Sequence, residues 1–491
     1  MTTDSQGRTI HHYDYIKSCN NLANAIISHV STLINMLDSD GMTVLHQACA
    51  TANVELVTLL LEQPNIDLTI TDSYNRTPLQ YVELLIQACC HSPEEYTNKY
   101  EEWNGKYHLI AALLTNDNDS IVSGDNIQEL HNRNSRLNAD QCDSLLHSAV
   151  SIDDSDTVSF ILSNSLIPVN ARNKYGDTPL HLAAETGHIE YVKLLLSMPD
   201  IDVNAQTVSE LIPGRHTPLH YAVRGGHTEC VKLLLAQPGI NVNAKDKDGY
   251  TPLHYAMKNG NVECVKLLLE HQNINVNAQD KSGYTPLHLA AEKGHTECFK
   301  LLLDYNRIEI NTTDRSGCTP LHLAAENGHS ECIKLLLGMP GVDVNAPCRH
   351  DYRDDYTSLH LAAENGHTEC VKVLLGHKDV NVNAQDEDGC TPLHFAVQNG
   401  HSECVKLLLG SKDINVNVQI TDGYYKGYTP LHWAARNGKT ECLKLLLAQK
   451  VIDVNVKDNE GKTPLAQAES VWNKDDKQEI ISILKQHGAT M

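Results

Sequence analysis

The chain has 491 residues and a formal net charge of −23, because 62 Asp and Glu residues outnumber 39 Lys and Arg residues. Such an acidic surface repels phosphate backbones and anionic membrane surfaces, which argues against nucleic acid as a partner. No run approaches the roughly 20 apolar residues of a membrane-spanning helix, so we expect no membrane insertion.

The first 18 residues, MTTDSQGRTIHHYDYIKS, contain no apolar segment of the kind found in secretory signals. The 15 cysteines show no compact disulfide framework and suit a reducing compartment. We therefore expect a cytoplasmic protein. A bacterial effector that is exported by a specialised system, and that acts in the host cytosol, would have the same sequence features.

Residues 1–42 are predicted to hold a polar segment and a capping helix. The apolar residues between Leu22 and Leu37 recur with helical spacing, which predicts that this helix covers them. Residues 43–115 then hold two repeat-like units, which open at Thr43 and Thr77. The second unit is predicted to contain an inserted helix before its apolar second helix.

In the second unit the inserted helix is predicted to begin at Ser92, and the apolar second helix to run from Tyr107 to Leu114. Residues 116–143 are rich in Asn, Asp and Ser, which predicts a polar insertion loop on the surface. The insertion either decorates one array or divides it into two blocks, and the sequence is compatible with both.

Residues 144–462 repeat one unit with a period close to 34 residues, and residues 463–491 form a last unit with a polar outer face. The motif Thr-Pro-Leu-His, with near copies at the sixth and last positions, begins at Thr178, Thr217, Thr251, Thr285, Thr319, Thr357, Thr391, Thr429 and Thr463. A fixed period of this size is typical of stacked units, because one such unit cannot bury its apolar face alone. The last unit is predicted to be a C-terminal capping repeat.

The copy that opens at Thr285 predicts the structure of one unit. Thr285 is a good N-cap, and Pro286 occupies the first helical position, where its missing N–H costs nothing. Gly294 is expected to end this helix in the left-handed conformation. A second helix carries the Leu301–Leu303 run, and an extended loop then turns at Gly317.

The succession Thr-Pro-Leu-His-x-Ala, Gly-His, Leu-Leu-Leu and Val-Asn-Ala resembles the ankyrin repeat. The resemblance covers residues 178–491 almost without a gap and residues 43–162 more faintly. It implies an all-α repeat solenoid, an ankyrin-repeat array of about 12 helix-turn-helix-hairpin units with N- and C-terminal caps. It also implies protein recognition without catalysis, which is the known role of that family.

The abundant histidines and cysteines follow the repeat. Sixteen of the 27 histidines stand in two fixed positions, represented by His288 and His295, and seven cysteines stand in the position of Cys298. We interpret both sets as structural, and the lack of a Cys-x-x-Cys pair argues against zinc. Nucleotide-binding, metalloprotease and nucleophile-elbow motifs are absent from the sequence, so we expect no enzyme, no metal and no cofactor.

The resemblance places recognition on the hairpin tips and on the adjoining face of the first helix of each unit. Three tips, 207–216, 347–356 and 419–428, are four or five residues longer than the others. Either they bind a partner, since Tyr and Arg often anchor interfaces, or they merely tolerate insertion. The candidate partner-binding residues are Tyr250, Tyr284, Arg349, Tyr352, Arg353, Tyr356, Tyr424, Tyr425, Tyr428 and Arg436. Aromatic residues of the first helix are assigned to packing: Tyr221, Tyr255, Phe395 and Trp433.

We predict a monomeric, non-catalytic scaffold that binds a partner protein on its concave hairpin-tip and inner-helix face. The partner itself is not identified by the sequence. One alternative is an adaptor or secreted host-interacting effector that engages a second partner through the 90–141 insertion. A weaker alternative is a small enzymatic unit in residues 1–142, although about 50 inserted residues cannot build an ordinary enzyme core.

Overall fold

A computed structural model of the whole chain gives the fold. It describes residues 34–37, 41–50, 53–61, 63, 65–73, 75–83, 107, 110, 111, 114, 147, 150, 158, 169–173, 175–208, 214–350, 353–469 and 474–491. The helix predicted at Ser92, the loop 116–143 and Tyr352 lie outside the described residues.

The chain divides into two compact units, residues 1–225 and residues 226–491, which we call unit 1 and unit 2. The described helices of unit 1 are α2 Val44–Ala50, α3 Val54–Leu61, α9 Pro179–Thr186, α10 Ile189–Leu196 and α11 Pro218–Gly225. Unit 2 contains α12 Thr228–Leu235, α13 Pro252–Asn259, α14 Val262–Glu270, α15 Pro286–Lys293, α16 Thr296–Leu303, α17 Pro320–Glu326, α18 Ser330–Leu337, β1 Cys348–His350, β2 Arg353–Tyr356, α19 Ser358–Glu364, α20 Thr368–Leu375, α21 Pro392–Asn399, α22 Ser402–Leu409, α23 Pro430–Arg436, α24 Thr440–Leu447, α25 Pro464–Ala468 and α26 Lys474–Gln486.

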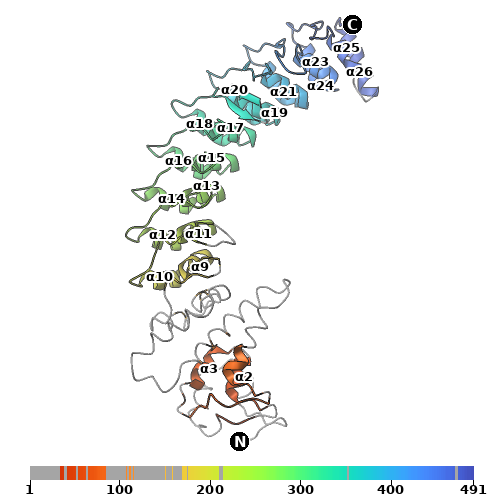
Figure 1. Cartoon of the computed structure of the whole chain (residues 1–491). Helices are drawn as coiled ribbons and strands as arrows, with labels where there is room; N and C mark the ends of the chain where they lie inside the picture. Colours follow the sequence, from red (N-terminus) through yellow and green to blue (C-terminus); the bar gives the residue numbers. More distant parts are fainter. Residues whose placement is uncertain are drawn as a thin grey trace. The chain divides into compact units, whose positions relative to one another are not determined.

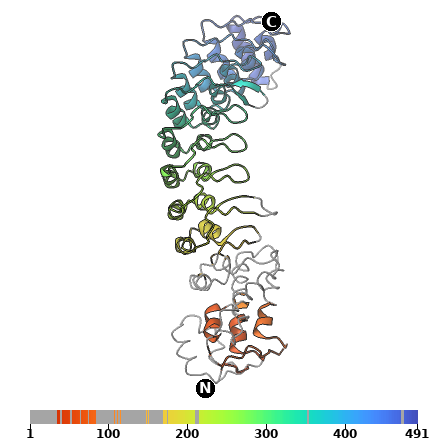
Figure 2. The ribbon, with the colours of Figure 1, turned by 60° about the vertical axis from the view of Figure 1, so that its left-hand side comes forward.

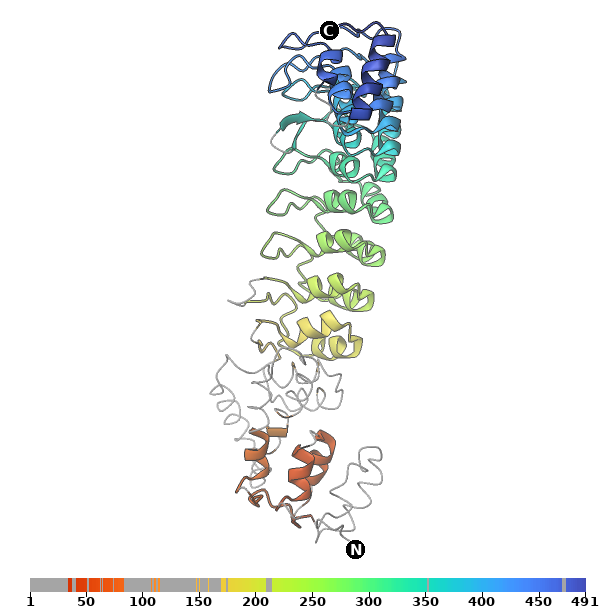
Figure 3. The same cartoon turned by 90° about the vertical axis from the view of Figure 1, so that its right-hand side faces the viewer.

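In unit 2 the repeats stack as helix pairs. The first helix of each repeat packs against the first helix of the next, as α13 does against α15, and the second helices do the same, as α14 does against α16. Figures 1 and 2 show these two rows of helices in green and blue. In Figure 3 the hairpin loops of successive repeats extend from one side of the rows. The prediction of a repeat solenoid is confirmed.

The local signals in the repeat act as predicted. The hydroxyl of Thr285 accepts the His288 N–H at 3.4 Å, and Pro286 follows as the first residue of α15. Gly294 ends α15 with φ of 70°, and a Cβ there would lie 2.3 Å from Nδ1 of His329 in the next repeat. The Nε2–H of His329 donates to the Glu292 carbonyl at 3.0 Å. The Gly-His pair of the motif thus serves the packing of one repeat on the next.

Buried apolar residues fill the space between the helices. Leu287 and Leu302 are fully buried, and Cys298 is 1% exposed. Burial raises the pKa of the Cys298 thiol to about 11, as expected for a packed residue that stays protonated. The Glu and Lys residues on the second helices form exposed ion pairs, such as Glu331 with Lys334 at 2.9 Å.

A ladder of asparagine side chains joins the loops at the base of the repeats. Asn277 Nδ2 donates to the Arg307 carbonyl at 2.7 Å, and its Oδ1 accepts the Glu309 N–H at 3.1 Å. The equivalent pair of bonds recurs in the described repeats at Asn35, Asn170, Asn243, Asn311, Asn345, Asn383, Asn417 and Asn455.

The predicted helix over Leu22–Leu37 is wrong at its C-terminal end. Residues 34–37 form a turn followed by irregular chain, because Asn35 uses its side chain in the asparagine ladder, where it bonds the backbone of Asn65 and Asp67. The predicted second helix at 107–114 is confirmed for its described residues 107, 110, 111 and 114, which are helical.

Candidate functional site

The hairpin tips of unit 2 are joined by backbone hydrogen bonds into one continuous surface, which we call the tip ladder. Each bond runs from an N–H in one tip to a carbonyl in the tip before it. The pairs are Lys281 to Asp248 at 2.9 Å, Arg315 to Ser282 at 2.9 Å, Arg349 to Ser316 at 2.7 Å, Glu387 to Asp354 at 3.2 Å, Thr421 to Asp388 at 2.7 Å and Asn459 to Lys426 at 3.2 Å. Residues that are far apart in the sequence are therefore neighbours along the tips.

In most of the described repeats the histidine of the Thr-Pro-Leu-His motif fixes the base of the following tip, whereas Nε2 of His394, which precedes the long tip at 419–428, has no hydrogen-bond partner among the described residues. The Thr285 N–H donates to Nδ1 of His288 at 3.1 Å, so Nδ1 is an acceptor and the proton sits on Nε2. Nε2 then donates to the Cys318 carbonyl of the next repeat at 3.1 Å. Burial lowers the pKa of the equivalent His254 to about 4 and that of His322 to about 4. These rings are neutral structural clamps at pH 7 rather than poised acid–base groups.

The tyrosines that directly precede a motif threonine pack their rings on the motif histidine of their own repeat. Ring centroids are 5.4 Å apart for Tyr250 and His254, and 5.2 Å apart for Tyr356 and His360. Tyr250 is half-buried, whereas Tyr356 is only 1% exposed. This ring contact reduces the exposed area of each tyrosine in that position. It cannot be inferred from the sequence.

Of the ten predicted partner-binding residues, the structure exposes some and buries others. Tyr424 is 84% exposed. Arg349 is also exposed, while Tyr250, Tyr284, Tyr425 and Arg436 are half-buried. The expectation that Tyr356 and Tyr428 lie on the surface is wrong, because they are 1% and 5% exposed. Tyr352 and the side chain of Arg353 lie outside the described part of the structure.

In each regular tip of unit 2, one aspartate side chain accepts the hydrogen bonds that hold the two ends of the tip together. Oδ1 of Asp246 accepts the N–H groups of Asp248 and Tyr250, at 2.9 and 2.8 Å. Asp280, Asp314, Asp386 and Asp458 do the same in their own tips. In the three long tips this position is occupied instead by Thr207, Cys348 and Ile420. The sequence contains this signal, since the aspartate is missing wherever the tip is long.

The long tip at 347–356 forms the two-stranded antiparallel sheet of β1 and β2. Cys348 pairs with Tyr356, and His350 pairs with Arg353. Arg349 forms an exposed ion pair with Asp354, with Nε and Oδ1 separated by 3.5 Å. The strands thus replace the aspartate closure by a short backbone ladder.

The long tip at 419–428 carries the densest aromatic group in the described part of the chain. We call Tyr424, Tyr425, Tyr428, Trp433 and Arg436 the aromatic tip cluster. Ring centroids are 4.9 Å apart for Tyr424 and Tyr425, and 4.3 Å apart for Tyr425 and Trp433. The guanidinium of Arg436 lies 5.4 Å from the Tyr425 centroid, and its Nη1 donates to the Tyr428 hydroxyl at 2.9 Å. The cluster supports one exposed ring, that of Tyr424, on a packed base.

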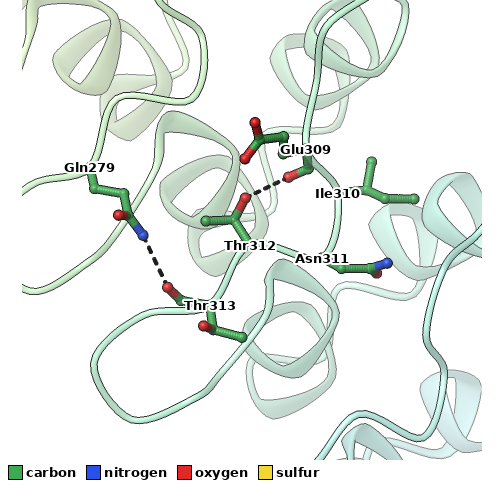
Figure 4. Close-up of a pocket in the computed structure, with 6 residues that line it drawn as sticks. All are labelled: Gln279, Glu309, Ile310, Asn311, Thr312 and Thr313. Atoms are coloured by element: carbon green, nitrogen blue, oxygen red, sulfur yellow. Dashed lines mark hydrogen bonds between the residues drawn. The ribbon is translucent and has the colours of Figure 1, made fainter.

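A second feature of the loops is an open groove of about 520 Å³, drawn in Figure 4. It is lined by Gln279 and by residues 309–313. Gln279 Nε2 donates to the Thr313 carbonyl at 3.1 Å, and the Thr312 hydroxyl donates to the Glu309 carbonyl at 3.0 Å. These bonds hold the loops that form the groove.

The described residues contain neither a membrane-spanning helix nor a cluster of metal ligands. Within these residues no helix is long and apolar enough to cross a bilayer. The same residues contain no group of three or more His, Cys, Asp or Glu side chains arranged to hold a metal ion. The insertion 90–141 and most of residues 1–142 lie outside the described residues, so the second-partner and enzymatic alternatives stay predictions.

Family models described as ankyrin repeats match most of the sequence. One described as three copies matches residues 103–207, 205–280, 271–348, 341–420 and 417–491, and one described as many copies matches residues 29–82. These matches are consistent with an array of about 12 repeats.

Two curated relatives resemble part of the chain. Transient receptor potential cation channel subfamily A member 1 of Homo sapiens is 32% identical over 208 residues, and alpha-latrocrustotoxin-Lt1a of Latrodectus tredecimguttatus is 33% identical over 215 residues. Each alignment covers 40% of this chain but only 18% and 15% of the respective relative. The chain thus spans less than a fifth of the length of either protein. Among solved structures, the human ASB11 ankyrin repeat domain is 28% identical with a TM-score of 0.41, over 49% of this chain and 100% of that one.

Proposed function

Because the chain belongs to the ankyrin-repeat family, whose fold generally serves as a non-enzymatic interaction module, we propose that it is a non-catalytic scaffold that binds a partner protein through its tip ladder. The aromatic tip cluster is the anchor of this binding surface. The monomeric state and the cytoplasmic location stay predictions from the sequence.

The exposure of Tyr424 carries this proposal. A tyrosine ring that is 84% exposed buries little area in the folded chain, so it adds little to folding. Its only ring contact in the described part of the chain is with Tyr425, which in turn packs on Trp433. The ring is thus presented to solvent on a supported base, and a pre-organised aromatic side chain binds a partner with a small loss of conformational entropy.

The residues around Tyr424 favour the same use of this tip. Arg436 contacts both Tyr425 and Tyr428, so the side chains below Tyr424 hold one another in place. Lys426 and Asp422 are exposed beside the cluster and can form the polar rim that surrounds many interface anchors. Tyr250, Tyr284 and Arg349 extend the proposed surface along the tip ladder.

Site-specific photocrosslinking in cells tests the proposal. A photoreactive amino acid at position 424 is expected to trap a partner protein, whereas the same amino acid at position 451 is not. Val451 is a suitable control because it is 70% exposed but lies outside the tip ladder. Affinity capture with Tyr424→Ala, compared with Val451→Ala, should then lose the trapped protein. The proposal fails if both positions crosslink the same proteins and if Tyr424→Ala captures them as well as the wild type does.

A further inference from the structure

The tip ladder becomes more acidic toward the C-terminus of unit 2. Each of the first three tips balances one exposed basic side chain with one exposed or half-exposed carboxylate, and the pairs are Lys247 with Asp248, Lys281 with Asp280, and Arg315 with Asp314. The following tips carry exposed or half-exposed carboxylates at Asp354, Asp355, Glu387, Asp388, Asp422 and Glu460. The same tips carry four basic residues, Arg349, Arg353, Lys426 and Lys462. Two of them already form ion pairs, Arg349 with Asp354 and Lys462 with Glu460. The backbone bonds between tips make the acidic stretch continuous.

Two carboxylates lie close to the backbone that directly precedes Tyr424. Oδ1 of Asp422 accepts the N–H of Gly423 at 2.8 Å. A Cβ on Gly423 would lie 3.1 Å from Oδ1 of Asp388, so this second carboxylate also lies against the backbone just before Tyr424. An aromatic face beside two carboxylates attracts an ammonium or guanidinium group, through the ring quadrupole and through charge.

Other tyrosine rings of the array already contact Lys or Arg side chains of the protein itself. Lys258 Nζ lies 5.5 Å from the ring centroid of Tyr250, and the Arg436 guanidinium lies over Tyr425 and Tyr428. In the described part of the chain, no cation of the protein lies over the ring of Tyr424. This ring is the one member of the aromatic tip cluster that presents its surface to an external cation.

A second observation concerns the indole N–H of Trp433, at the base of the aromatic tip cluster. The side chain is 5% exposed, and its indole Nε1–H is buried without an acceptor among the described residues. A buried donor without an acceptor costs free energy. Trp433 packs directly on Tyr425, so this donor without an acceptor lies at the base of the exposed ring.

We propose that the tips at 354–355, 387–388, 420–428 and 459–460 bind a Lys- or Arg-rich segment of a partner protein, with one cationic side chain over the ring of Tyr424. This inference rests on the proposed function and names the partner's chemistry. Stacked helices are about 8–10 Å apart, so four successive tips span roughly 25–30 Å. An extended segment of about nine residues covers that distance.

Peptide binding to the full-length chain tests this inference. Labelled nona-arginine and nona-glutamate are titrated by fluorescence anisotropy at about 0.15 M salt, where charges beyond roughly 8 Å are screened. Nona-arginine is expected to bind, and its affinity is expected to fall about tenfold in the double variant Glu387→Gln/Asp422→Asn. Tyr424→Ala should weaken binding about threefold to fivefold, and Tyr424→Phe should bind like the wild type because it keeps the aromatic face.

A matched control separates a local site from general attraction by an acidic protein. The double variant Glu331→Gln/Glu403→Gln changes the net charge by the same amount, and both carboxylates are more than half exposed on second helices, where they pair with Lys334 and Lys406. This control should lower nona-arginine affinity less than twofold. Circular dichroism of all variants confirms that the fold is kept.

Two outcomes overturn the inference. The first is an equal loss of nona-arginine affinity in the tip variant and in the control variant, which would assign binding to net charge alone. The second is binding of nona-glutamate at least as tight as that of nona-arginine. If either occurs while crosslinking from position 424 still traps a protein, the proposed function stands and only the basic character of the partner is wrong. A further sign of the site is a change in tryptophan fluorescence on binding that disappears in Trp433→Phe.

Discussion

The regular tip at 246–250 and the long tip at 420–428 begin and end in the same way. The Asp246 N–H donates to the Tyr250 carbonyl at 2.9 Å, and the Ile420 N–H donates to the Tyr428 carbonyl at 2.9 Å. In the opposite direction Gly249 donates to Asp246 at 3.2 Å, and Gly427 donates to Ile420 at 2.8 Å. The scaffold therefore holds both ends of the long tip as it holds a regular tip. The added residues between them are available for another purpose.

The two tips differ in the side chains that hold their ends together. In the regular tip, Asp246 accepts two backbone N–H groups with Oδ1 and the Tyr255 hydroxyl with Oδ2, at 2.7 Å. In the long tip, the buried side chain of Ile420 has no hydrogen-bond acceptor, and Trp433 replaces the tyrosine of the first helix. The packing of Tyr425 on Trp433 takes the place of the polar closure. A polar closure fixes a short tip, and an aromatic base supports a longer one.

Acidification is expected to have the largest effect, because it charges the buried motif histidines along the array. Burial lowers the pKa to about 3 or 4 at His181, His254, His322, His360 and His394. In the unfolded chain histidine binds a proton near pH 6.5, so the stabilisation is full above that pH and is lost as the pH falls through it toward 4. The free energy of unfolding should fall by about 1.4 kcal/mol per histidine for each pH unit in this window.

Urea unfolding measured between pH 7.5 and pH 5 tests this expectation, since that range lies above the ordinary titration of carboxylates. Midpoints that stay constant across the range would contradict the assignment of neutral, clamped histidines.

The next effect concerns the base of the long tip. Tyr428→Ala removes a ring that is 5% exposed, that packs on His432 and that hydrogen-bonds Arg436. It is expected to lower the free energy of unfolding by about 3 kcal/mol, as other large-to-small changes of buried aromatic residues do. Tyr428→Phe keeps the ring and should cost about 1 kcal/mol. A loss below 1 kcal/mol for the alanine variant would show that the ring is not part of the scaffold.

The regular tip should respond to the loss of its polar closure. Asp246→Ala removes the acceptor of two backbone N–H groups and of the Tyr255 hydroxyl, so we expect a loss of about 2 kcal/mol in the free energy of unfolding. Asp248→Ala, at the exposed point of the same tip, is the control and should change stability by less than about 0.5 kcal/mol. Equal losses in the two variants would contradict the role given to Asp246.

Exchange of one tip for the other tests whether the insertion is independent of the scaffold. Replacing residues 420–428 by Asp-Lys-Asp-Gly-Tyr, the sequence of the regular tip 246–250, should change the free energy of unfolding by less than about 1 kcal/mol. Crosslinking or capture through this tip should be lost. If the exchanged chain fails to fold, the long tip is required by its neighbours, and the similarity of the two closures is misleading.

The smallest expected effect on stability is that of Tyr424→Ala. The ring is 84% exposed, so its removal should change the free energy of unfolding by less than about 0.5 kcal/mol. Partner capture should nevertheless fall. A variant that destabilises the chain by more than 1 kcal/mol would place Tyr424 in the scaffold with Tyr428, and the contrast between the two tyrosines would disappear.

Much of the fold could be predicted because its signals are local and repeated. Thr285, Pro286 and Gly294 act within one turn of the helix that they begin or end, so their roles can be inferred without neighbours. The absence of helix at residues 34–37 could not be predicted, because it depends on a hydrogen bond from Asn35 to the next repeat. The sequence named Tyr424, Tyr425, Tyr428 and Arg436 of the proposed site as candidates, but it could not show which of these rings is exposed and which is buried.

Sequence alone determined the period of the array, the caps and stops of its helices, and the positions where tips are lengthened, because each depends on residues close together in the chain. Only the tertiary structure decided which tyrosines face solvent. Tyr250, Tyr284, Tyr356 and Tyr428 share one position in the repeat, yet two are half-buried and two are buried, and Tyr424 four residues earlier is exposed. The burial of each ring depends on the motif histidine, the first helix and the neighbouring tip that surround it. That environment exists only when the repeats are stacked.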